Sequence, residues 1–165
     1  VGRGLLLDIA GWKGVKHLGL GEPVTASDLT NCAAAQGSTV QSGDILLVRT
    51  GWLRVFEEDR DLFNKGEPGI DASTLPWLKE HDIAAVGVDN GAAEVLASRS
   101  NVQIPVHLGA IRDLGIYLME NLDLDALAAD RVNESLLVIA PLESHGRRWQ
   151  PNHPCCHSVS RPHQR

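Results

Sequence analysis

The segment Pro105-Val106-His107 to Ile116-Tyr117-Leu118-Met119-Glu120-Asn121 presents a histidine and a carboxylate from strongly patterned local sequence. Proline is tolerated in the first turn of a helix, and Gly115 is a typical helix stop. Between them, three apolar residues recur at helical spacing: Leu108, Ile111 and Leu114. Residues 116–119 form an apolar run of strand length. The segment therefore predicts a helix that begins near His107 and a buried strand that ends at Glu120.

These two residues are candidates for one site. In open α/β sheets, ligands bind outside the carboxyl ends of the strands, so a glutamate at a strand end and a histidine at a neighbouring helix start are expected to converge. The alternative is that His107 is a solvated helix-start histidine and that Glu120 lies in a surface turn beside Asp123 and Asp125. Spacing alone leaves both interpretations open.

The composition is that of a globular domain. A chain of 165 residues has the length of about one domain, and its 43% hydrophobic and 22% charged residues are ordinary values. No apolar run approaches the roughly 20 residues that span a bilayer, so no membrane segment is expected. Three cysteines, two of them adjacent, do not make a disulfide framework, which favours a reducing, cytoplasmic compartment.

Charge is unevenly distributed along the chain. Residues 1–142 carry 20 acidic residues against 11 Lys and Arg, a net charge of −9, whereas residues 143–165 carry one acidic residue against four arginines, a net charge of +3. An acidic body argues against nucleic acid as a partner. The first residue is Val1 rather than Met and no signal segment follows it, so we expect the later part of a longer protein.

Apolar runs and helix signals alternate along the chain. Strands are expected at residues 5–9, 45–48, 83–88, 116–119 and 136–140, and a second helix at 73–81. Thr25 and Asp28 form a capping box for a helix that runs to Gln36. The glycine-rich segment 11–23 is expected to be a loop, and the charged segment 57–69 a mobile excursion. This alternation predicts an α/β fold.

Polar residues follow two of the expected strands. Arg49-Thr50-Gly51-Trp52 comes after strand 45–48, and Asp89-Asn90-Gly91 comes after strand 83–88. Trp52 is a candidate for stacking on a substrate ring, although a tryptophan after a strand commonly serves packing instead. Asn90 is the second candidate for a substrate contact.

The last 23 residues, 143–165, have a different composition and are expected to be disordered, because Val159 is their one aliphatic residue. One interpretation is a metal-binding appendage, whose ligands would be His153, Cys155, Cys156 and His157. Adjacent cysteines do not have the spacing of zinc modules. We favour a frameshifted or misassembled end, because moving the frame by one base allows a Gly-Ser-Pro turn near residue 150 and small apolar residues after it. The coding DNA tests this hypothesis.

Taken together, the His107–Glu120 segment, Arg49-Thr50-Gly51-Trp52, Gly87-Val88-Asp89-Asn90 and the Glu120-Asn121-Leu122 corner resemble the cyclase family of metal-dependent hydrolases. That family includes bacterial kynurenine formamidase (arylformamidase), an enzyme of tryptophan catabolism. The resemblance covers Val1 to Leu142 and implies a layered β/β/α fold of the swivelling type, incomplete at its N-terminal side. Members of the family end in a Gly-Ser-Pro turn and a strand, and the shifted reading frame of residues 143–165 would encode such an end.

The resemblance also implies a chemistry. The family hydrolyses amide bonds of aryl formamides or related cyclic substrates at a Zn²⁺ or Mn²⁺ centre, and His107 and Glu120 resemble its later metal ligands and catalytic groups. This sequence lacks the family's earlier His-x-Gly-Thr-His-x-Asp segment. Because catalytic zinc takes about three protein ligands, we expect a weak or inactive hydrolase.

Two further expectations follow. The alternative to a hydrolase is a catalytically dead remnant that persists as a folded or dimerising module. A chain that lacks the earlier part of such a fold should leave strand edges unpaired, and unpaired edges promote association. A homo-oligomer is therefore expected.

Overall fold

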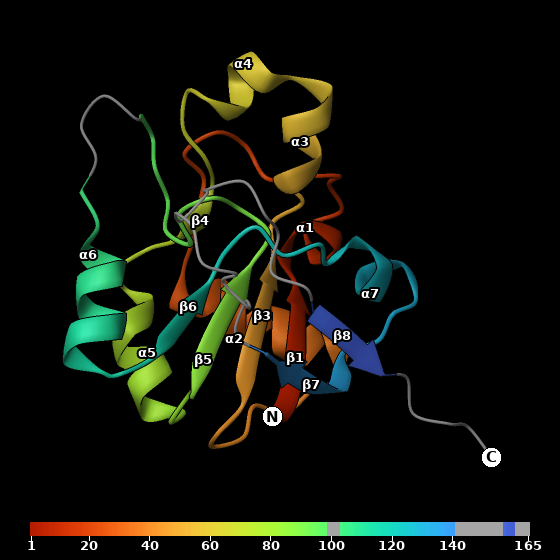
Figure 1. Cartoon of the computed structure of the whole chain (residues 1–165), viewed down its shortest axis with the longest axis vertical. Coiled ribbons are helices and arrows are strands. Elements are labelled where there is room, and N and C mark those ends of the chain that lie inside the picture. Colours follow the sequence, from red (N-terminus) through yellow and green to blue (C-terminus); the bar gives the residue numbers. More distant parts are fainter. Residues whose placement is uncertain (99–102, 141–156, 161–165) are drawn as a thin grey trace, which may run out of the picture.

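A six-stranded sheet organises the chain, and its strand order is β6-β5-β3-β1-β7-β8 (Figure 1). The computed structural model describes residues 1–98, 103–140 and 157–160. The strands are β1 (Gly2–Asp8), β3 (Ile45–Arg49), β5 (Ala85–Val88), β6 (Tyr117–Met119), β7 (Glu134–Ile139) and β8 (His157–Ser160). Strands β1, β3, β5 and β6 run parallel, whereas β7 is antiparallel to β1 and to β8. A separate parallel pair joins β2 (Pro23–Val24) to β4 (Gly69–Ile70). The predicted α/β class is confirmed.

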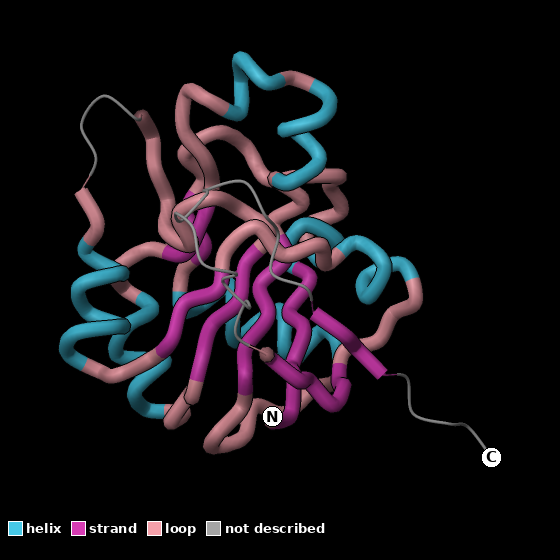
Figure 2. The backbone as a smooth tube through the Cα atoms, in the orientation of Figure 1, coloured by secondary structure: helices cyan, strands magenta, loops and turns pink. Residues whose placement is uncertain are grey.

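Helices connect the parallel strands, as the tube in Figure 2 shows. They are α1 (Ile9–Trp12), α2 (Ala26–Gln36), α3 (Leu53–Glu58), α4 (Arg60–Phe63), α5 (Thr74–Glu80), α6 (Pro105–His107), the π-helix η1 (Leu108–Asp113) and α7 (Asp125–Ala129). The predicted capping box is present at α2, where the Thr25 hydroxyl accepts from the Asp28 amide at 3.2 Å and the Asp28 carboxylate accepts from the Thr25 amide at 2.8 Å. Gly37, with φ +67°, ends this helix.

The core lies on both faces of the sheet because successive side chains of a strand point to opposite faces. On one face, Leu5 and Leu7 of β1 belong to a cluster that includes buried residues of α2 and α5. On the other face, Leu6 packs in a smaller cluster with Leu122, Leu124 and other residues. Strands buried on both faces explain the continuous apolar runs of β1 and β3.

Two expected loops contain structure. Ile9 begins α1 rather than ending a strand, because the Asp8 carboxylate accepts from the Gly11 amide and caps a short helix. Segment 57–69, expected to be a mobile excursion, contains the end of α3, all of α4 and the start of β4. Gly66 to Gly69 are buried there because this segment pairs with residues near Leu96 and Ala93. Segment 57–69 therefore contains helical and strand residues, and its mobility stays a prediction.

The segment around His107 differs in detail from its prediction. Pro105 does lie in the first turn, but the helix continues as a π-helix, and Leu108 and Ile111 are about half exposed. The buried face carries Val106 and Ala110 instead. The following strand was expected to be buried, yet β6 is an edge strand of the described sheet and Tyr117 is 77% exposed.

In the C-terminal segment, the structure describes only residues 157–160. These form β8 and pair antiparallel with β7. The outer edge of β7 offers the backbone donors and acceptors that this pairing uses. The metal site predicted from His153, Cys155 and Cys156 lies outside the described residues, as does the turn expected near residue 150. Within the described ranges, no helix is long and apolar enough to cross a bilayer.

Candidate functional site

His107 lies between two carboxylates. Its Nδ1 is 2.5 Å from Oε1 of Glu94, and its Nε2 is 3.1 Å from Oε1 of Glu120. Glu94 comes from the segment that precedes α6, His107 from α6 itself, and Glu120 from the residue after β6. The structure therefore brings the two predicted residues together and adds a third.

Glu94 is held by the first turn of α6. The residue before the helix, Ile104, supplies no side-chain cap, so the amides of Val106 and His107 need an acceptor from elsewhere. Glu94 provides it, since its Oε2 accepts from the Val106 amide at 3.0 Å and its Oε1 from the His107 amide at 3.3 Å. One carboxylate thus caps the helix and contacts the imidazole.

The three side chains differ in their access to solvent. The Glu94 side chain is 2% exposed, whereas those of His107 and Glu120 are 24% and 31% exposed. Burial raises the pKa of Glu120 above its ordinary value, the charge of Glu94 acts in the same direction, and His107 opposes both. His107 and Glu120 are therefore partly accessible to a ligand, whereas Glu94 is buried and holds the His107 imidazole.

The corner between β5 and β6 positions Glu120. The amide of Asn121 donates to the Asn90 carbonyl oxygen at 3.0 Å, and the amide of Leu122 donates to the Val88 carbonyl oxygen at 2.9 Å. Asn121 adopts a left-handed conformation with φ +57°, which turns the chain directly after Glu120. The end of β5 thereby fixes the backbone that carries the carboxylate.

A second buried carboxylate joins the ends of β3 and β5. Asp89 is 2% exposed and accepts from the Thr50 amide at 2.8 Å, the Thr50 hydroxyl at 2.6 Å and the Gly51 amide at 2.7 Å. Burial raises the pKa of Asp89 to about 6, although these hydrogen bonds oppose the rise. Asp89 therefore fixes the turn that leads from β3 to Trp52.

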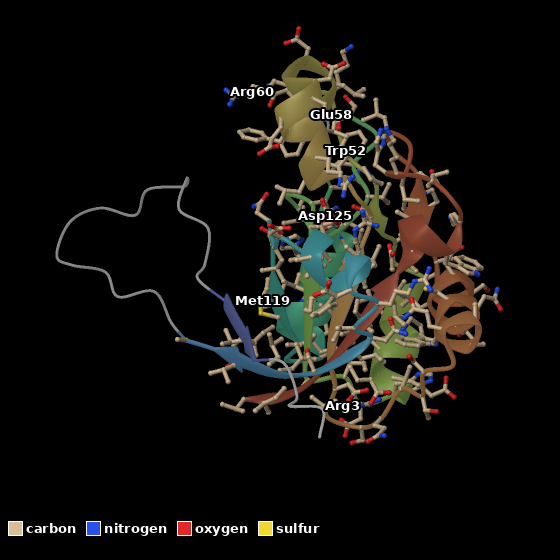
Figure 3. All side chains as sticks on the ribbon, turned by 90° about the vertical axis from the view of Figure 1, so that its right-hand side faces the viewer. Arg3, Trp52, Glu58, Arg60, Met119 and Asp125 are labelled. Atoms are coloured by element: carbon tan, nitrogen blue, oxygen red, sulfur yellow. The ribbon has the colours of Figure 1, made fainter. Side chains whose placement is uncertain are left out.

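Trp52 and Asn90, the predicted substrate contacts, are both fully buried. Figure 3 shows Trp52 at the base of α3, and its ring lies 6.4 Å from Phe63 in a stacked arrangement and 5.8 Å from His17. The side-chain amide of Asn90 donates to the Pro68 carbonyl oxygen at 2.5 Å. Among the described residues, neither side chain forms a hydrogen bond or ring contact with His107, Glu94 or Glu120. Trp52 Nε1 and Asn90 Oδ1 have no hydrogen-bond partner there.

The residues fit a metal ion only in part. His107 Nε2 and a Glu120 oxygen are ligand atoms of the types that zinc and manganese accept, and a carboxylate on the other imidazole nitrogen is the usual support for a metal-binding histidine. However, no group of three or more potential ligands in residues 1–98, 103–140 and 157–160 could hold a metal ion. The described chain therefore does not complete a metal centre.

Sequence reasoning missed Glu94. Glu94 lies in a segment that shows no helix or strand periodicity, so no element is predicted there. The available signal was the absence of a capping residue before Pro105, which leaves the first amides of α6 without an acceptor. The missing cap indicates that the first backbone amides of α6 need an acceptor, but it does not identify the residue that provides one.

A hollow elsewhere contains none of the predicted site residues. It has a cavity volume of about 470 Å³ and lies beside the end of β1 and the start of α1, where it is lined by Asp8, Trp12, Gln36, Arg131 and others. The His107 group lies instead across the sheet, beside β5 and β6. The two places are separate.

Comparison with known proteins gives consistent results. The family model described as Putative cyclase matches residues 1–95. A crystal structure of a novel cyclase is 34% identical, with a TM-score of 0.77, over 86% of this chain and 49% of the other. Isatin hydrolase A from Labrenzia aggregata is 20% identical, with a TM-score of 0.65, over 86% of this chain and 55% of the other. A predicted metal-dependent hydrolase from Bacillus stearothermophilus is 23% identical, with a TM-score of 0.57, over 86% and 56%.

The last two likenesses concern the fold alone. No match was found among curated proteins. The chain spans about half the length of the solved structures that it matches. The family model covers more than half of this chain, and the fold agrees with that of the cyclase structure. This chain therefore belongs to the cyclase family.

Proposed function

We propose that this chain carries the His107 and Glu120 part of a metal-dependent amide hydrolase of the arylformamidase type, which is weak or inactive in the isolated chain. The observation that supports this proposal is the 3.1 Å contact between His107 Nε2 and Glu120, because both groups are accessible and Glu94 anchors the imidazole. The metal, Zn²⁺ or Mn²⁺, would need ligands beyond these two side chains.

The chemistry assigned to the chain itself is proton transfer. Amide hydrolysis requires a proton for the departing amine, and a positioned histidine or carboxylic acid commonly supplies it. Burial raises the pKa of Glu120, and its carboxyl lies 3.1 Å from His107 Nε2, within reach for proton transfer. His107 and Glu120 would therefore share a proton in the metal-free chain, and with a metal bound at His107 Nε2 the carboxyl of Glu120 would be the group that carries the proton.

Aryl formamides and cyclic aryl amides are the proposed substrates. Both contain an amide bond whose nitrogen is attached to an aromatic ring, so cleavage releases the same kind of leaving group. Isatin, which gives its name to one of the structural neighbours, is a cyclic aryl amide. The chain would meet such a substrate from the accessible side of His107 and Glu120.

Hydrolysis of formanilide and of isatin would test the proposal. The purified chain is assayed with Zn²⁺ or Mn²⁺, first alone and then co-expressed with the part of the 34% identical cyclase that it does not cover. We expect little or no activity alone and clear activity in the combined protein. His107→Ala should lower kcat/KM of the combined protein by roughly 10² to 10⁴, the usual contribution of a general acid or base.

His81→Ala is the matched control, because His81 contacts Trp77 and takes no part in the group around His107. It should leave kcat/KM unchanged. A combined protein that is folded and active but indifferent to His107→Ala would refute the proposed role. Activity of the isolated chain that depends on His107 would show that the expected weakness is wrong.

A dead, dimerising module is the second candidate. It is favoured by the incomplete ligand set and by the edge position of β6 in the described sheet, where Tyr117 is largely exposed. Light scattering tests the association, for which we expect a homo-oligomer. A monodisperse monomer would count against this candidate.

A further inference from the structure

We infer that Glu94 is a positioning residue that fixes His107 in the tautomer with the proton on Nδ1, which leaves Nε2 as the nitrogen with a free lone pair. The chemical meaning of this arrangement rests on the proposed function, but the tautomer itself does not. The inference adds to the site a residue that neither meets the substrate nor supplies the proton.

The first step is that Glu94 acts as an acceptor. Its two oxygens already accept from the amides of Val106 and His107, and these backbone groups can only donate. A glutamate side chain is ordinarily a carboxylate at neutral or alkaline pH and then has no hydrogen to give. The 2.5 Å contact with Nδ1 of His107 therefore requires the proton to be on Nδ1.

The second step concerns the rigidity of this acceptor. Glu94 is 1% exposed, and the amides that bind it belong to the same helical turn as His107. Carboxylate and imidazole are therefore fixed to one element, and the side chain has little freedom to turn away. A charge-assisted hydrogen bond of this kind is roughly twice as strong as a neutral one.

The consequence falls on Nε2. A neutral imidazole carries one proton, so a proton on Nδ1 leaves a lone pair on Nε2. That lone pair faces Oε1 of Glu120 at 3.1 Å. Nε2 is thus directed toward the accessible carboxylate, where it can accept a proton or bind a cation.

Two other histidines provide internal references. Nδ1 of His17 lies 2.8 Å from the Leu18 carbonyl oxygen, and Nδ1 of His81 lies 2.9 Å from the Trp77 carbonyl oxygen. A carbonyl oxygen can only accept, so both should carry the proton on Nδ1 regardless of residue 94. A change confined to His107 can therefore be recognised in the same spectrum.

The experiment is long-range ¹⁵N–¹H correlation NMR of the ¹⁵N-labelled full chain. The chain is first treated with a chelator, and spectra are recorded near pH 9, well above the ordinary histidine pKa of about 6.5. Signals of His107 are identified by their loss in His107→Ala. We expect the Nδ1–H form for His107 in the wild-type chain.

Glu94→Gln is the diagnostic variant, because glutamine keeps the shape but not the charge and can offer an amide hydrogen to Nδ1. It should shift the ratio of the two His107 tautomers by about tenfold toward Nε2–H, as expected for the loss of roughly 1.4 kcal/mol of hydrogen-bond preference. His17 and His81 should not change. Glu94→Asp keeps the charge, so it should move the ratio less than Glu94→Gln does.

Two results would overturn the inference: an Nε2–H form in the wild-type chain, or a Glu94→Gln variant that is less stable but has an unchanged tautomer ratio. The second would mean that Glu94 only caps α6. If Glu94→Gln does not fold, the wild-type spectrum still decides. An Nδ1–H form in a combined protein without hydrolase activity would uphold this inference and refute the proposed function. An Nε2–H form in a combined protein with hydrolase activity would refute this inference and uphold the proposed function.

Discussion

Asp89→Asn is expected to remove a pH dependence of stability that Asp89 creates. The wild-type carboxyl is 2% exposed, and burial raises its pKa to about 6 from 3.8. Asparagine has the same shape and cannot titrate. The difference between the two proteins, measured across pH, therefore isolates the contribution of this carboxyl to the free energy of unfolding.

The sign follows from proton binding. A pKa that is higher in the folded chain means that the folded state holds the proton more tightly than the unfolded state. The stabilisation is fully present below pH 3.8 and is lost as the pH rises through 6. One pKa unit corresponds to 1.36 kcal/mol, so the whole loss is about 3 kcal/mol, most of it between pH 4 and pH 7.

Urea unfolding at pH 4, 5, 6 and 7 measures the effect. The free energy of unfolding of wild type minus that of Asp89→Asn should fall by about 2 to 3 kcal/mol across this range. Asp61→Asn, at an exposed aspartate, is the control for the substitution itself. A difference that stays flat or rises with pH for Asp89 would refute the reasoning. It would mean that the hydrogen bonds from Thr50 and Gly51 outweigh the cost of burial.

Three further predictions concern the fold and use unfolding midpoints as the readout. Arg49→Met should lower the free energy of unfolding by about 2 to 3 kcal/mol. This is less than for a fully buried ion pair, because the carboxylates of Asp8 and Asp125 that bind the buried guanidinium are partly exposed. Arg112→Ala is the control at an exposed ion pair and should leave the midpoint unchanged. Gly51→Ala should cost far more than Gly14→Ala, since both have φ above +70° but only at Gly51 would a Cβ meet the backbone of the preceding loop. Thr25→Ala should cost about 1 kcal/mol through the lost cap of α2, and an unchanged midpoint would contradict this role.

The interior strands of the sheet were predictable because burial on both faces leaves a direct mark on the sequence. All five residues of β3 are buried, and the apolar run 45–48 marks them. Helix α2 was predictable for another local reason, namely that Thr25 and Asp28 satisfy each other's backbone amides within four residues. In both cases the determining interactions involve neighbouring residues or uniform burial.

The edge of the sheet was not predictable in this way. An apolar run of strand length predicts a buried strand, but within the described residues β6 pairs with β5 alone, and Tyr117 is 77% exposed. The helix before it was expected to bury Leu108 and Ile111, whereas it buries Ala110, and Gly109 packs closely against Leu75 of α5. A small residue that allows a neighbouring helix to approach gives no apolar signal of its own.

Two of the three residues of the site, His107 and Glu120, were predictable from the sequence, and Glu94 was not. The reason lies in how each residue is positioned. His107 and Glu120 each mark the end of a regular element, and sequence patterns identify such ends. Glu94 belongs to no helix or strand, and its contact with His107 depends on the chain folding back so that a buried carboxylate meets the first turn of α6. A carboxylate with 1% exposure is stable there only because three donors satisfy it, and one of them is the imidazole. The need to pair a buried charge and the orientation of the candidate catalytic histidine are therefore met by the same contact, so loss of the Glu94 charge should disturb helix capping and imidazole orientation together.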